Sequence, residues 1–395
     1  MHLIVSSKDK LQAKYGPGGL AQLEAKLQEY RAVLRNKNLD SALVYVDDPA
    51  SLSPFNPSGL SGSAEPSGRA SGRGLTEAPS GQSLAPVDAE DPTAIKGLLD
   101  ALENALIASG QTLDSVLILG GDEIIPFHRL PNPSYSPGWD PDEEVPSDNP
   151  YASTDDEYLI PERAVGRMPD GRSNDIGLLL AQLDAAITHH TQSALSFFNF
   201  GYSAQVWRKA SQAVYDTVGK LIFLRLSPPE TAESFRAWWL RRRRFLYFNL
   251  HGSKDTPYWY GQRGSSYPVA FSPQLVASGD VKGVVAFSEA CYGANIIGKD
   301  PDEAISLKLM QQGAACFVGS TKIAFGPSEP PSSEADLIGV YFLRHVKNRM
   351  PFGQAFKEAK IAFAKEMYDR QGGLDDDDEK TLLEFVLYGD PTLRR

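Results

Sequence analysis

The sequence has little cysteine: only Cys291 and Cys316 occur among its 395 residues. Two cysteines cannot build the disulfide framework on which small secreted domains depend. The fold must therefore rest on a buried apolar core, and a hydrophobic content of 42% is typical of a globular protein that has one. We expect Cys316, in the middle of the apolar run AACFVG, to belong to that core.

Long apolar runs are missing as well. No stretch approaches the ~20 apolar residues that span a bilayer. The three apolar residues after His2 are too few for the core of a signal peptide. We therefore expect no membrane association and a cytoplasmic location, or a secreted one if a leader has been removed from the chain.

Basic residues are outnumbered, with 39 Lys and Arg against 50 Asp and Glu and a net charge of −11. A general nucleic-acid binder needs an electropositive face, and the single dense basic run, Arg241–Arg244, is too short to supply one. Residues 140–156 are rich in acids but lack the spacing of an EF-hand. We expect this stretch and the acidic turn at 375–379 to be solvated, and we expect no metal or other cofactor. The alternatives are a calcium site in the loop and a cation site at the turn.

Short apolar runs alternate with amphipathic segments along most of the chain, which predicts an α/β fold with a mostly parallel sheet and helices on both faces. The expected strands are Leu3–Ser6, Ala42–Asp47, Val116–Leu119, Phe245–Leu250, Val284–Ser288 and Ala315–Gly319. The expected helices are Leu20–Leu34, Thr93–Ala108, Ile176–His190, Glu303–Gln312, Glu334–Val346 and Phe352–Met367.

Residues 51–90 interrupt this alternation. Twenty of these forty residues are Ser, Gly or Pro, so we interpret the segment as a flexible insertion. Arg69 and Arg73 lie within it in the small-residue context SGRASGRG, which a protease could thread easily. Two interpretations stay open: a plain linker, or a site at which the protein is cut after one or both arginines.

The residues that carry chemistry follow two of the expected strands. His251-Gly252 comes directly after FLYFNL, and Cys291 comes directly after VVAFSEA. Reactive side chains collect at the carboxyl ends of strands in an open α/β sheet, and an imidazole there can take the proton of a thiol. Gly252 and Gly293 allow close approach of a substrate backbone. The amides of Gly252 and Cys291 could donate to a developing oxyanion. The alternative is a structural thiol beside an ordinary His-Gly turn.

Six short motifs span the chain from residue 116 to its end. They are VLILGGDEIIP (116–126), SDNPYA (147–152), ERAVGRMP (162–169), NLHGS (249–253), SEACYGA (288–294) and LYGDPTLR (387–394). In this order they resemble the gingipain family of cysteine peptidases, within the caspase-like group. The resemblance implies a smaller N-terminal α/β subdomain, at residues 1–190, before a caspase-like catalytic subdomain, at 191–395. It also implies a dyad in which Cys291 is the nucleophile and His251 the base.

The sequence departs from the family pattern in two places. Gingipains orient the histidine with an acid, but the matching stretch, Phe198–Trp207, contains no Asp or Glu. A backbone carbonyl or another acid must then orient His251, and Glu289 is one candidate. In arginine-specific members, an acid binds the arginine side chain of the substrate. Its position falls in the poorly matching region Trp207–Asp216, so the substrate preference does not carry over.

Two segments are expected to form walls of the pocket that binds the substrate side chain before the scissile bond. They are Ser288-Glu289, before the nucleophile, and the stretch with Lys322 and Phe325, after the next strand. Strand alternation favours Glu289 over Ser288 for the face that carries Cys291. A carboxylate there would select a basic side chain. Alternatively, Glu289 points away and pairs with a surface or core partner, and an inward Lys322 would favour an acidic substrate.

The sequence therefore predicts a cysteine endopeptidase that acts on protein or peptide substrates, with a preference for Arg or Lys before the scissile bond. Two rival interpretations remain. One is a catalytically idle caspase-like module that binds a partner, which the missing acid favours. The other is a hydrolase that uses the acidic loop and a metal.

Overall fold

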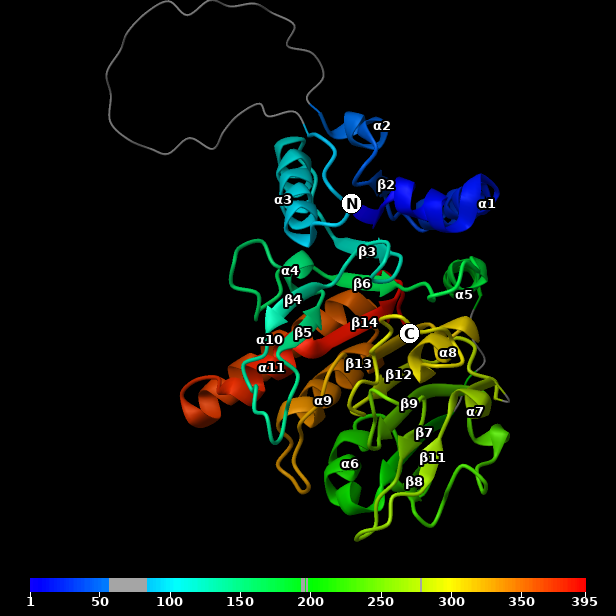
Figure 1. Cartoon of the computed structure of the whole chain (residues 1–395), viewed down its shortest axis with the longest axis vertical. Coiled ribbons are helices and arrows are strands. Elements are labelled where there is room, and N and C mark those ends of the chain that lie inside the picture. The colour runs from blue at the N-terminus through cyan, green and yellow to red at the C-terminus, as the bar shows by residue number, and fades with distance from the viewer. Residues whose placement is uncertain (57–83, 193–195, 197, 278) are drawn as a thin grey trace, which may run out of the picture.

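The computed structural model describes residues 1–56, 84–192, 196, 198–277 and 279–395. Within these residues a ten-stranded sheet has the order β2-β1-β3-β6-β14-β13-β12-β9-β7-β8, from the top to the bottom of Figure 1. Its strands are β1 (His2–Ser6), β2 (Ser41–Tyr45), β3 (Ser115–Leu119), β6 (Val165–Met168), β7 (Phe198–Ala204), β8 (Leu224–Ser227), β9 (Arg243–Asn249), β12 (Val285–Ser288), β13 (Cys316–Ser320) and β14 (Phe385–Gly389). All neighbours in the sheet are parallel except β13 and β14.

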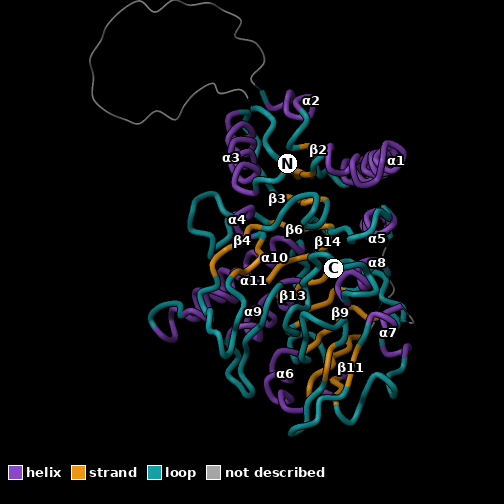
Figure 2. Tube along the Cα trace, in the orientation of Figure 1, coloured by secondary structure: helices purple, strands orange, loops and turns teal. Residues whose placement is uncertain are grey.

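Helices cover both faces of the sheet, and Figure 2 shows them as two outer groups with strands between them. One layer contains α1 (Lys8–Asn36), α5 (Gly177–Thr191), α7 (Pro273–Ala277) and α8 (Ile305–Gln311). The other contains α3 (Pro92–Ala108), α6 (Arg208–Tyr215), α9 (Glu334–Lys347), α10 (Phe352–Gln371) and α11 (Asp376–Glu384). The predicted α/β class with a mostly parallel sheet is confirmed. None of the helices in the described residues is long and apolar enough to cross a membrane.

Two small hairpins stand outside the main sheet. One pairs β4 (His128–Pro131) with β5 (Glu144–Ser147), and the other pairs β10 (Trp259–Tyr260) with β11 (Val269–Phe271). The β4–β5 hairpin reaches residues that follow far later in the chain. The Thr321 hydroxyl donates to the Pro146 carbonyl over 2.8 Å, and the Ser147 hydroxyl donates to the Leu383 carbonyl over 2.6 Å.

The last strand, β14, lies between strands from two separate stretches of the chain. On one side it pairs with β13 along its whole length. On the other it contacts β6 through Tyr388 and Arg167. Strands β1, β2, β3 and β6 all precede residue 169, whereas β7, β8, β9, β12 and β13 lie between residues 198 and 320. The division into subdomains at residue 190 stays a prediction, and it falls at the last turn of α5, before β7.

Every strand and helix expected from the sequence is present, but the acidic stretches are only partly solvated: seven of their acids are exposed, at positions 143, 144, 155, 156 and 375–377, whereas three others are buried. Asp140 pairs with Lys380 at a fully buried site. Asp148 is buried against Arg167. At 375–379, Asp375 caps α11 in a reciprocal pair of hydrogen bonds with Asp378, which is also buried. Within the described part of the chain, no group of three or more His, Cys, Asp or Glu is placed to hold a metal ion.

A buried arginine supports the junction between β6 and β14. The Arg167 guanidinium forms two hydrogen bonds with Asp148, of 2.6 and 3.0 Å, and donates to the carbonyls of Gly120 and Ile125 over 2.9 and 2.7 Å. The side chain has no solvent exposure. It also lies over the Phe127 ring, 4.1 Å from its centre. A charge this deep is tolerated because carboxylate and carbonyl oxygens surround it.

We predict that Arg167→Met destabilises the protein by about 3–5 kcal/mol, because it leaves the Asp148 carboxylate buried without its partner. Urea unfolding measures the loss. Arg172→Met is the matched control, since Arg172 is half-exposed beside Asp300 and Glu303 and its pairs contribute about 1 kcal/mol or less. Equal losses in the two variants would contradict the structural role of Arg167.

Candidate active site

The register of two parallel strands sets the position of the histidine and the cysteine. Phe248 in β9 is the partner of Ser288 in β12, and the Glu289 amide donates to the Phe248 carbonyl over 2.9 Å. His251 and Cys291 each follow three residues after these partners. Both side chains therefore leave the sheet at the same edge, at the carboxyl ends of neighbouring strands.

The backbone of Gly252 lies against the nucleophile candidate. A β-carbon at this glycine would stand 1.8 Å from the carbonyl oxygen of Cys291, so no larger residue fits. Among the described residues, neither the Gly252 amide nor the Cys291 amide has a hydrogen-bond acceptor. The Cys291 thiol donates to the carbonyl of Ala324, with Sγ and O 3.6 Å apart. Two free amides and a thiol are thus gathered at one point.

A glutamine orients the histidine. The Nε2 atom of His251 lies 2.7 Å from Oε1 of Gln262. The Gln262 side-chain NH₂ donates to the Tyr267 hydroxyl and to the Gly264 carbonyl, which fixes the oxygen toward the imidazole. Nε2 therefore carries the proton and Nδ1 keeps a free lone pair. The indole of Trp207 packs on the imidazole, with ring centres 4.3 Å apart.

Burial keeps both reactive groups neutral. It raises the pKa of the Cys291 thiol to about 11, although the hydrogen bond to Ala324 opposes this shift. Burial also lowers the pKa of His251 below its ordinary 6.5, although the bond to Gln262 opposes this shift. No hydrogen bond joins the thiol and the imidazole in the part of the chain that the structure describes. The site therefore holds an uncharged thiol and an uncharged imidazole.

Glu289 lies behind the nucleophile and not beside the histidine. Its carboxyl group is buried next to that of Asp336 and near Tyr247. Burial, and then the neighbouring Asp336, raise the pKa of Glu289 well above its ordinary value, and burial raises that of Asp336 to about 7. Sequence analysis offered a backbone carbonyl or Glu289 to orient His251, and the partner is instead Gln262. Nothing in the local sequence around Gln262 signals this role.

The second expected wall is the loop after β13. Lys322 forms an ion pair with Asp142, with Nζ and Oδ1 2.9 Å apart, and so is not free to meet an acidic substrate. The Phe325 ring packs under the Lys380 ammonium group, 4.6 Å away. Ser288 is fully buried, and its hydroxyl accepts from the Ala290 amide. The loop is thus next to the thiol, whereas Ser288 faces the protein interior.

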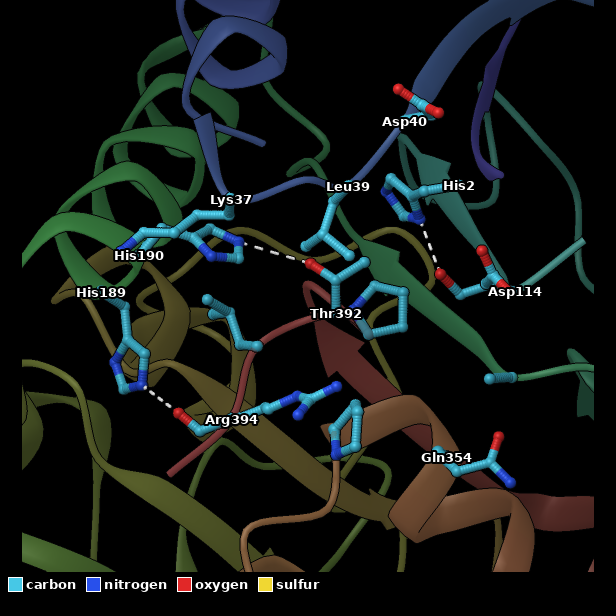
Figure 3. A pocket seen from close by; sticks show the side chains of 15 residues that line it. His2, Lys37, Leu39, Asp40, Asp114, His189, His190, Gln354, Thr392 and Arg394 are labelled. Atoms are coloured by element: carbon cyan, nitrogen blue, oxygen red, sulfur yellow. Dashed lines mark hydrogen bonds between the residues drawn. The ribbon is translucent and has the colours of Figure 1, made fainter. Parts of the chain in front are cut away.

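A cavity of about 730 Å³ lies away from this site (Figure 3). It is bounded by the first residues of β1 and β3, the end of α5 and the segment after β14. The imidazoles in its wall are engaged with the protein itself: His2 with Ser115 over 2.8 Å, and His189 with the Arg394 carbonyl over 2.9 Å. The cavity lining does not include His251, Gly252, Gln262, Glu289 or Cys291.

Comparison with known proteins identifies the relatives of this chain. Residues 21–215 and 259–395 match the model of peptidase family C25. The matched part includes Cys291 and leaves out residues 216–258, and with them His251. No curated protein matches the chain.

Three solved structures share the fold. A protease structure has a TM-score of 0.61 at 11% identity, and covers 100% of this chain and 78% of its own. The complex of the pro- and mature domains of RgpB from Porphyromonas gingivalis has a TM-score of 0.59 at 14% identity, with coverages of 100% and 79%. The Arg-specific cysteine proteinase gingipain R has a TM-score of 0.56 at 14% identity, with coverages of 100% and 78%. At these identities the likeness shows the fold.

We predict that Gly252→Ala displaces the backbone of Cys291, destabilises the protein by about 1–3 kcal/mol and changes the rate at which iodoacetamide alkylates Cys291. Urea unfolding and mass spectrometry measure the two effects. The control is Gly97→Ala in α3, where an added β-carbon meets nothing within 4 Å and stabilises a helix by about 0.5–1 kcal/mol. Unchanged stability and alkylation in Gly252→Ala would refute the close packing described here.

Proposed function

Because the chain belongs to peptidase family C25 and is a cysteine-type endopeptidase, we propose that Cys291 is its nucleophile and His251 its general base. The observation that carries this proposal is the contact between Gly252 and the Cys291 carbonyl, which brings the His-Gly segment against the backbone of Cys291. The free amides of Gly252 and Cys291 support an oxyanion hole at the same place. The substrates are proteins or peptides, and no cofactor is part of the proposed reaction.

The reaction starts from the neutral pair. Sγ of Cys291 attacks the carbonyl carbon of the scissile bond while Nδ1 of His251 takes the thiol proton. The carbonyl oxygen gains the negative charge and accepts hydrogen bonds from the amides of Gly252 and Cys291. The imidazolium then gives its proton to the leaving amine as the C–N bond breaks. A water molecule, deprotonated by His251, hydrolyses the thioester and restores the thiol.

Gln262 positions the base in this mechanism. Its oxygen holds the Nε2 proton of His251, so that Nδ1 stays free for the thiol proton. An amide stabilises the imidazolium less than a carboxylate would. The glutamine therefore fixes the tautomer and the ring direction without adding a charge to the site.

We predict that Cys291→Ala abolishes peptide hydrolysis and labelling by a peptide electrophile that reacts with thiols. His251→Ala is expected to lower kcat/KM by about 10²–10⁴-fold, because it removes the general base. Cys316→Ala is the control, since that thiol is buried in β13 and its loss should leave labelling in place. Labelling that survives in both Cys291→Ala and His251→Ala would place the nucleophile elsewhere.

The proposal extends to a preference for Arg or Lys before the scissile bond. Glu289 and Asp336 form a buried acid pair two residues from the nucleophile, and no cation pairs with either among the described residues. A basic substrate side chain beside them would supply the missing positive charge. One of the two acids would then ionise, and its contact with the cation would become a charge-assisted hydrogen bond.

The proposal also includes self-cleavage in the insertion. Its two ends meet, because the Leu84 amide donates to the Asn56 side chain over 2.6 Å. Arg69 and Arg73 lie between these ends, outside the described residues. A cut after either arginine would leave both pieces attached to the sheet, since β2 precedes the insertion and α3 follows it.

A single experiment tests both extensions. Mass spectrometry of the purified wild type should find termini created after Arg69 or Arg73, and Cys291→Ala should remain intact. Glu289→Gln should slow this cleavage, and that of basic sites in a peptide library, by about 10–100-fold, because it cannot ionise to meet the cation. The control is Glu329→Gln, at an exposed ion pair with Lys209. An intact wild-type chain refutes self-cleavage, and an unaltered basic preference in Glu289→Gln refutes the pocket.

A further inference from the structure

An aspartate in the β4–β5 hairpin connects two parts of the active site. Asp142 lies in the turn between β4 and β5, with its side chain 10% exposed. Its Oδ2 atom accepts a hydrogen bond from the Tyr292 hydroxyl over 2.6 Å. Its Oδ1 atom pairs with the Lys322 ammonium over 2.9 Å. Both carboxylate oxygens are therefore used, and both partners belong to the surroundings of the thiol.

Both partners belong to segments that adjoin or contact the nucleophile. Tyr292 directly follows Cys291 and has a φ of +55°, in the left-handed region that a tyrosine adopts only when its surroundings impose it. Its amide donates to the Lys322 carbonyl over 2.7 Å. Two residues after Lys322, the carbonyl of Ala324 accepts the thiol hydrogen bond. Asp142 thus connects the residue after the nucleophile with the loop that accepts the hydrogen bond of the thiol.

A second aspartate in the same turn fixes the same loop. Asp140 pairs with Lys380, and the Lys380 ammonium also donates to the Ile323 carbonyl. The Thr321 hydroxyl, just before the loop, donates to the Pro146 carbonyl of β5. The β4–β5 hairpin therefore contacts Thr321 and Lys322 directly and Ile323 through Lys380. Among the described residues of the hairpin, Asp142 is the one that also bonds to Tyr292.

We propose that Asp142 is a positioning residue of the peptidase, whose carboxylate aligns Cys291 by holding Tyr292 and Lys322 together. The inference rests on the proposed function, in which Cys291 is the nucleophile. Asp142 touches neither the thiol nor the imidazole, and acts through its two partners. A misplacement of the nucleophile by about 1 Å can cost two orders of magnitude in rate, so the loss of the carboxylate should appear in kcat.

The chain offers a matched control in the next residue. Glu143 is exposed, lies in the same turn and forms no side-chain hydrogen bond or ion pair with the described residues. Glu143→Gln removes the same charge from the same turn as Asp142→Asn but leaves Tyr292 and Lys322 untouched. Any effect of net charge or of the turn itself would therefore be shared by the two variants.

The test compares peptide hydrolysis by Asp142→Asn, Tyr292→Phe, the double variant and Glu143→Gln. Asp142→Asn should lower kcat by about 10–100-fold with little change in KM, because substrate contacts remain. Tyr292→Phe, which removes a single hydroxyl, should lower kcat in the same direction. The kcat of the double variant should be no lower than that of Asp142→Asn alone, since both changes affect the same hydrogen bond between Tyr292 and Asp142. Glu143→Gln should match the wild type.

Urea unfolding of each variant separates positioning from stability, and Tyr292→Phe tests the proposal should Asp142→Asn fail to fold. A wild-type kcat in a folded Asp142→Asn or Tyr292→Phe overturns the proposal, as does an equal loss in Glu143→Gln. These outcomes leave the dyad intact if Cys291→Ala is inactive in the same assay. Full activity of Cys291→Ala would instead refute the dyad, and the positioning role with it.

Discussion

The parallel pairing of β9 with β12 is the constraint on which the site depends. Its register places His251 and Cys291 three residues past paired positions, so both leave the sheet at one edge. A slip of one residue would turn the following side chains to opposite faces and separate them. Gly252 completes the arrangement, because only a residue without a side chain lets the two segments touch. The position of His251 and Cys291 therefore depends on the backbone hydrogen bonds between β9 and β12 and on the absence of a β-carbon at Gly252.

The groups around His251 and Cys291 carry little unpaired charge. The thiol and the imidazole are neutral, and the imidazole is oriented by an amide. The pKa values of Glu289 and Asp336 are raised, and Asp140 and Asp142 pair with lysines. In the proposed mechanism, ionisation accompanies substrate binding and does not precede it. A neutral thiol of this kind reacts slowly with small electrophiles until a substrate carbonyl and its hydrogen bonds are in place.

Local patterns in the sequence predicted the fold class, the main strands and the placement of His251 and Cys291, because apolar runs and the residues that end them are local features. Four strands of the main sheet were missed: β6, β7, β8 and β14. In β6, Arg167 interrupts the apolar pattern, and the burial of that arginine depends on Asp148. Gln262 and Asp142 were missed for a similar reason. Asp142 bonds to Tyr292, which is 150 residues away in the sequence. The acidic turn is expected to be solvated because the lysines that pair with it, Lys322 and Lys380, are also distant in the sequence.

The position of β14 has a consequence for the order in which the enzyme is built. This strand, residues 385–389, lies between β6 and β13 and so joins strands made much earlier on the ribosome. The two stretches of sheet cannot be joined through β14 until those residues have been synthesised. Strand β13 also cannot form its hydrogen bonds with β14 before then, and β14 pairs with it along its whole length. The loop after β13 accepts the hydrogen bond of the Cys291 thiol. The topology therefore delays completion of the protease until nearly all of its described chain exists.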